Sequence, residues 1–193
     1  MNTLPDPDGE LPDGLPDSRK AAPSASRVVE TFGSDMIRAF CVATGLRFAR
    51  DQDGDVVVRF SYGRARDCAL RVYAYASGRG RSILCVRVVS DKRFREAHRH
   101  ALLEAINRFH CDRRWPKVYV KPSDNTVSVV CEAQVDLAMG AHQGLVNDFI
   151  DTAISSANGF WRSLRESGIP SVQDEWKCEP VDPFMGGGER LDT

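Results

Sequence analysis

The chain has 193 residues, of which 42% are hydrophobic and 27% are charged, a composition typical of a soluble globular domain. It contains no run approaching the ~20 apolar residues that a membrane-spanning helix needs. Its acidic beginning also lacks the basic and then apolar layout of a secretory signal. We therefore expect a cytoplasmic protein with one folded domain and no membrane segment.

The charge is unevenly spread along the chain, whose net charge is −1. Residues 1–23 hold five acids against two bases and residues 167–193 hold six against two, which leaves +6 for the segment between them. Residues 1–23 are rich in Pro, Gly and Asp with almost nothing to bury, so we predict a disordered acidic tail. We place an α+β domain at 24–166 and a Pro/Gly-rich tail at 167–193, which Trp176 and Phe184 could pin to the surface.

The first element is predicted to be a helix from Ser24 to Gly45. Its apolar residues recur on one helical face: Val29, Phe32, Met36, Phe40 and Ala43. Either Ser24 or Ser26 can cap its start, and Gly45 is expected to end it.

Alternating polar and apolar residues then predict strands at 46–50, 56–60, 68–76 and 83–89. Asp51, Asp53 and Asp55 have a spacing similar to a calcium loop, but Gly54 precedes the third acid and position 60 is Phe, so we interpret the segment as a hairpin turn. The segment 77–82 lacks the glycine and lysine pattern of a phosphate-binding loop and is interpreted as a second hairpin tip.

A long amphipathic helix is expected to begin at Phe94 and to end before Pro116, followed by a strand at 117–120 and a further strand at 126–137. The last helix is predicted at Gly144 to Arg165. The predicted fold is therefore a two-layer α+β domain with a largely antiparallel sheet, helices on one side, and the order α-β-β-β(-β)-α-β-β-α.

Cysteines and histidines give no pattern of a metal or catalytic site. Six cysteines stand far apart without a Cys-x-x-Cys pair: Cys41, Cys68, Cys85, Cys111, Cys131 and Cys178. Several of them, such as Cys41 and Cys85, have apolar neighbours, and we interpret these as small hydrophobes with no redox or nucleophilic role. The four histidines are the candidates for catalysis: His98, His100, His110 and His142. His98 and His100 point to different sides of a helix, and we expect neither to have an i+4 carboxylate or a nucleophile as a partner. We therefore expect no enzyme, no metal and no cofactor.

Three features in the same order resemble the bacterial YbjN family: the segment 106–120 (INRFHCDRRWPKVYV), the hairpin after it, and the Phe160-Trp161 pair in the last helix. The resemblance covers about residues 27–166. Many members have Trp-Asn where this chain has Phe109-His110, so no role is carried over to those side chains. The resemblance implies a fold similar to type III secretion chaperones, which often dimerise and bind extended client segments. Members are often labelled sensory transduction regulators, and the family supplies no catalytic residue.

The favoured function is a non-enzymatic, chaperone-like regulator that acts as a homodimer and binds a client or regulatory protein. Aromatic residues at element ends are the partner-binding candidates, with filling of the core as the alternative: Trp115, Tyr119, Phe160 and Trp161. Nucleic-acid binding is the second hypothesis, because the middle of the chain is basic. It is less favoured, since acids such as Glu96, Glu104 and Asp112 interrupt the arginines near the central helix.

Overall fold

The structure is a computed structural model that describes residues 28–62 and 68–172. The predicted tail at 1–23, the capping serines Ser24 and Ser26, and the C-terminal residues from 173 onward, with Trp176 and Phe184, lie outside these ranges. In the described part, no helix is both long and apolar enough to cross a membrane.

Seven antiparallel strands form one sheet in the order β1-β2-β3-β4-β7-β5, and β6 pairs with β7 as well. The strands are β1 (Phe48–Arg50), β2 (Val56–Tyr62), β3 (Cys68–Ser77), β4 (Ile83–Ser90), β5 (Phe94–Arg95), β6 (Lys117–Ser123) and β7 (Thr126–Asp136). The central strand β7 thus joins the β1–β4 meander to β6, although β4 and β7 are separated by a helix along the chain.

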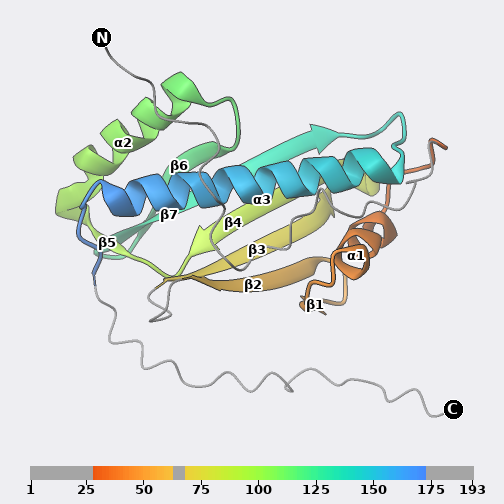
Figure 1. The fold of residues 1–193 in the computed structure, drawn as a ribbon, viewed down its shortest axis with the longest axis horizontal. Helices are drawn as coiled ribbons and strands as arrows, with labels where there is room; N and C mark the ends of the chain where they lie inside the picture. Colours follow the sequence, from red (N-terminus) through yellow and green to blue (C-terminus); the bar gives the residue numbers. More distant parts are fainter. Residues whose placement is uncertain (1–27, 63–67, 173–193) are drawn as a thin grey trace, which may run out of the picture.

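Three helices lie on one face of this sheet: α1 (Ser34–Ala43), α2 (Arg99–Asp112) and α3 (Gln143–Glu166). The long helix α3 runs across the sheet, α1 lies near its start, and α2 lies against β6 (Figure 1). Short 3₁₀ turns occupy 79–81 and 96–98. The predicted α+β class, the mainly antiparallel sheet and the one-sided helices are confirmed.

The core lies between the helices and one face of the sheet. Every second strand residue points into it, as the period of two requires, and Val72 pairs across the strands with Val58 and Val88. The helices close the core with buried apolar residues such as Ile37 of α1 and Leu102 of α2. Burial of the lengthwise apolar stripe of α3 fixes this helix on the sheet.

Two predicted helix starts are wrong. The first helix begins at Ser34, not Ser24, because Gly33 is extended (φ −159°) and Glu30 forms a bridge with Ala141. The central helix begins at Arg99, because Phe94 belongs to β5 and pairs with Val127. In both cases a residue inside the predicted helix, Glu30 or Phe94, pairs with a distant part of the chain instead.

Candidate functional site

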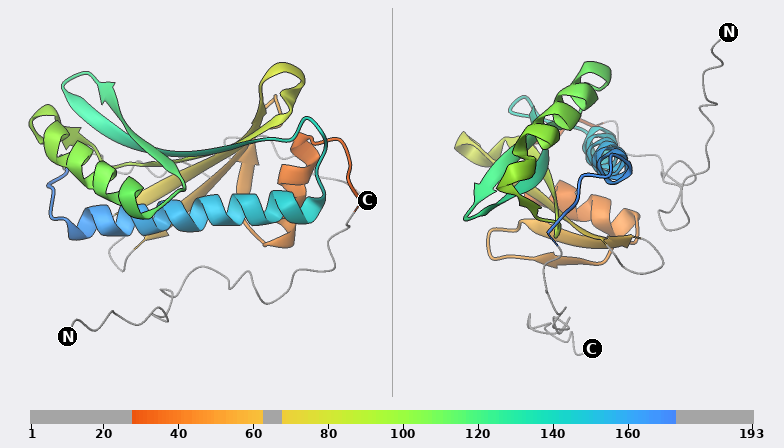
Figure 2. Two further views of the ribbon diagram at one scale, coloured as in Figure 1. Left: turned by 90° about the horizontal axis from the view of Figure 1, so that it is seen from above. Right: turned by 90° about the vertical axis from the view of Figure 1, so that its left-hand side faces the viewer.

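The face of the sheet opposite the helices carries a cluster of polar and aromatic side chains. In the described ranges, no helix covers this face, and Figure 2 shows that the sheet curves away from α3 at both ends, which makes the face concave. We call it the open face and define it by its central residues: Arg59, Arg71, Tyr73, Tyr75, Arg87, Lys117, Tyr119, Lys121, Glu132, Gln134 and Asp136. Cross-strand register places Tyr73, Arg87, Glu132 and Lys117 in one row across it.

Glu132 is the centre of the open face. Its side chain is only 7% exposed, and its carboxylate accepts hydrogen bonds from Arg87 Nη2 (2.9 Å), the Tyr119 hydroxyl (3.1 Å) and Gln134 Nε2 (3.2 Å). Burial acts to raise the pKa of Glu132, but the hydrogen bond and positive charge of Arg87 outweigh it and hold the pKa below its ordinary value. A charged carboxylate is therefore built into a sheet face that is otherwise open to water.

Aromatic rings surround this carboxylate. The Arg87 guanidinium carbon lies 5.7 Å from the centre of the Tyr75 ring, and the Lys117 ammonium lies 5.0 Å from the centre of the Tyr119 ring. Burial is the main cause that raises the pKa of both tyrosines, so their hydroxyls stay protonated at neutral pH. Five cations against two acids make the open face net positive.

The four residues predicted to bind a partner do not form one surface. Tyr119 lies on the open face, whereas Phe160 (2% exposed) and Trp161 (7% exposed) belong to α3 and are buried in the core. Trp115 is 43% exposed on the helical side, and its ring contacts Phe149 edge to face at 5.6 Å. Partner binding by these four residues stays a prediction. Of the four, only Trp115 and Tyr119 have side chains exposed enough to contact a partner directly.

Sequence reasoning missed most of the open face. Tyr73 and Tyr75 stand on the same face of one strand in the alternating pattern, and that pattern was the available signal. It does not say which face of the sheet the helices cover. Arg87 and Glu132 are 45 residues apart, and only the pairing of β4 with β7 brings them together.

A second concave feature, which we call the helix groove, lies between α2 and α3. Its volume is about 740 Å³, and small α3 residues such as Ser156 and Gly159 line it. Three arginines, two acids and Trp115 contribute to its walls: Arg108, Asp112, Arg113, Trp115, Arg162 and Glu166. No ion pair within the described ranges involves any of these three arginines.

Two histidine side chains, those of His110 and His142, lie within hydrogen-bond distance of backbone groups. His110 Nε2 lies 3.2 Å from the amide nitrogen and 3.3 Å from the carbonyl oxygen of Val118 on β6. His142 caps α3, where its Nδ1 accepts the Leu145 N–H at 3.0 Å. The expectation that His100 has no i+4 carboxylate partner is wrong, because His100 Nε2 lies 3.4 Å from Glu104 Oε1 on the exposed face of α2. None of these contacts joins a histidine to the open face.

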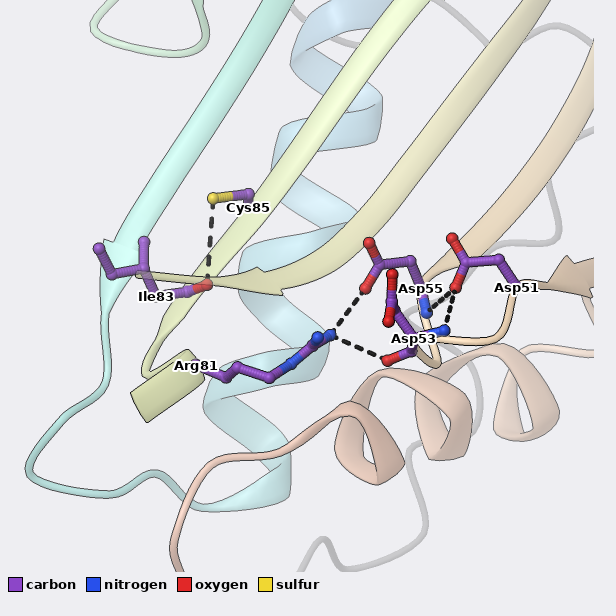
Figure 3. A network of polar contacts seen from close by, with 6 residues as sticks. All are labelled: Asp51, Asp53, Asp55, Arg81, Ile83 and Cys85. Atoms are coloured by element: carbon purple, nitrogen blue, oxygen red, sulfur yellow. Dashed lines mark hydrogen bonds and ion pairs between the residues drawn. The ribbon is translucent and has the colours of Figure 1, made fainter. Parts of the chain in front are cut away.

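The acidic loop that is similar to a calcium site is a hairpin turn, as predicted. The Asp51 carboxylate accepts the N–H groups of Asp53 and Asp55, so it shapes the turn itself (Figure 3). Arg81, from the tip between β3 and β4, donates to Asp55 Oδ1 at 2.9 Å and to the Asp53 carbonyl at 3.0 Å. These contacts tie the two hairpin tips together.

Comparison with known proteins adds the family. No curated protein matches this chain. The crystal structure of YbjN from E. coli, described as "a putative transcription regulator", has the same fold, with a TM-score of 0.59, 9% sequence identity, and coverage of 74% of this chain and 97% of that chain. The family model for YbjN, described as "Putative bacterial sensory transduction regulator", matches residues 34–166. Since this match spans the three helices and the whole sheet, the chain belongs to the YbjN family.

Proposed function

We propose that this protein is a non-enzymatic, chaperone-like regulator that holds an extended, acidic polypeptide segment on its open face. The observation that carries the proposal is the concave, uncovered sheet with tyrosines and a net positive charge around a fixed ion pair. Tyr and Arg are among the residues enriched where proteins bind one another. A function in the cytoplasm is part of the proposal.

The Glu132 contacts prepare the open face for binding. They hold Arg87 and Tyr119 in place before a ligand arrives, so less conformational entropy is lost on binding. The bond to Glu132 uses Nη2 of the guanidinium, and Nε is buried, so the N–H donors at Nη1 are the ones that can meet a ligand carboxylate. Because cations outnumber acids on this face, an acidic segment fits it better than a basic one.

Binding of a fluorescein-labelled, Asp/Glu-rich peptide, followed by fluorescence anisotropy, tests this proposal on the full chain. Replacing Arg59 and Arg71 by Ser should weaken binding roughly tenfold, because two charge contacts on the open face are lost. A matched control, Arg38→Ser with Arg165→Ser, removes two exposed arginines from the helical side and should leave binding unchanged. Equal losses in both double variants would refute recognition by the open face.

Single-stranded nucleic acid is the second candidate ligand for the same face. Tyrosines can stack with bases, and the cations can follow a phosphate backbone. A labelled mixed-sequence oligonucleotide in the same anisotropy assay distinguishes the two. Oligonucleotide binding that exceeds peptide binding, is lost in Arg59→Ser with Arg71→Ser and falls steeply with salt would replace the peptide proposal.

The homodimer is a further part of the proposal. It is supported by Leu103 of α2, which is 47% exposed on the helical side, since large exposed apolar residues often anchor interfaces. Sedimentation equilibrium of the full chain should give twice the monomer mass of 21.4 kDa. A strict monomer at tens of micromolar would contradict the dimer and leave the ligand of the open face to be tested separately.

A further inference from the structure

We infer that the acidic segment at 173–184 of the same chain docks into the helix groove. The groove presents Arg108, Arg113 and Arg162, and within the described part of the chain none of these arginines has an ion-pair partner. Asp112 and Glu166 also line it, so the excess is one positive charge. Trp115 adds a large apolar surface that is 43% exposed. A suitable occupant therefore combines carboxylates with aromatic side chains.

The C-terminal segment has this composition. Residues 173–184 read QDEWKCEPVDPF, with four acids, one lysine and the aromatic residues Trp176 and Phe184. The N-terminal segment 1–23 is also acidic but contains no aromatic residue. Of the two acidic ends of the chain, the C-terminal one fits both the arginines and Trp115.

The path of the chain favours the same segment. Ser167 lines the groove, and the described chain ends five residues later at Val172, whose N–H donates to the Arg93 carbonyl at 2.7 Å. Five residues span at most about 18 Å, so six or seven further residues are enough to return to the groove. Glu179, Asp182 and Phe184 are then within reach.

The N-terminal segment leaves the fold at the opposite end of α3. Glu30 pairs with Ala141, just before α3 begins, whereas the groove residues of α3 lie between Ser155 and Glu166. At 1.5 Å per residue, about 20 Å or more separates these positions along the helix axis. Attachment close to the groove gives the C-terminal segment a high effective concentration there.

Limited trypsin digestion of the full chain tests the inference, because Lys177 lies inside the segment. Neutralising Glu179→Gln and Asp182→Asn together should speed cleavage after Lys177 about fivefold, because two charge contacts with the groove are lost. The matched control, Asp13→Asn with Asp17→Asn, removes two acids from the N-terminal segment and should leave this rate unchanged. An unchanged rate in the Glu179/Asp182 variant would overturn the inference.

A second measurement reports on the groove itself. In the chain labelled with 5-fluorotryptophan, the ¹⁹F resonance of Trp115 should move in the Glu179/Asp182 variant, while that of buried Trp161 should not. Gly159→Leu, which fills the groove from α3, should move it in the same way and speed cleavage after Lys177. A Trp115 shift that depends on protein concentration would mean that the segment docks on a second copy, and would overturn docking within one chain.

Discussion

Substituting either partner of the Arg87–Glu132 ion pair should destabilise the protein, but by unequal amounts. The Glu132 side chain is 7% exposed, whereas that of Arg87 is 41% exposed. Arg87→Met leaves a buried carboxylate without its cation, and we expect a loss of about 2–3 kcal/mol in the free energy of unfolding. Glu132→Gln leaves a cation that water can solvate, and the amide still accepts from Tyr119, so the expected loss is about 1 kcal/mol.

The double variant completes the cycle. Because Arg87→Met and Glu132→Gln remove the same interaction, the double variant should lose about 1 kcal/mol less than the sum of the single losses. Urea unfolding followed by circular dichroism gives all four free energies, with an unchanged m-value as the check that the unfolded states are comparable. If Glu132→Gln costs more than Arg87→Met, or if the two effects simply add, the reasoning from unequal burial is refuted.

Three further outcomes follow from the structure. The pKa of Glu132 is held below its ordinary value, so the wild-type advantage over Glu132→Gln should be complete at pH 7 and shrink as the pH falls below about 4.5, as measured by urea unfolding across pH. Gly159→Ala adds a Cβ with nothing within 4 Å in α3 and should raise the melting temperature by about 1–4 °C; an unchanged or lower melting temperature would contradict the expected gain in helix propensity. Cys111 is exposed, while burial raises the pKa of the Cys41 thiol to about 11, so Cys111→Ser should remove one fast-reacting thiol in a titration of the native chain and Cys41→Ser should remove none.

The sequence predicted the strands better than the helix starts, for a physical reason. In β3 and β4, every second residue is buried, from Leu70 to Ala76 and from Leu84 to Ser90, so the period of two can be seen within each strand alone. The first helix was predicted too long because Val29 happens to share the helical spacing with Phe32 and Met36. Val29 is 61% exposed, and its neighbour Glu30 is held by Ala141, more than a hundred residues away. Pairing over that distance leaves no trace in a local pattern.

The open face could not be predicted from the sequence either, because strands far apart in the sequence form it. Its tyrosines on β3 are visible as one side of a strand, but the choice of which side the helices cover is made only in the assembled fold. Glu132 was counted among the polar residues of its strand, and nothing next to it in sequence shows that Arg87 fixes it. Trp115 and Phe160 were both predicted to bind a partner because they are aromatic residues at element ends, yet Trp115 is half exposed and Phe160 fills the core.

The contact of His110 with Val118 hinders the addition of a further strand to the sheet at β6. The N–H and C=O of Val118 face outward from β6, where the imidazole occupies them, and Pro122, two positions beyond Val120, has no N–H to offer. A strand from another molecule that aligned itself along β6 would have to displace the histidine and skip the proline. Association of two copies into one continuous sheet, and fibril growth from this border, are therefore both disfavoured at β6.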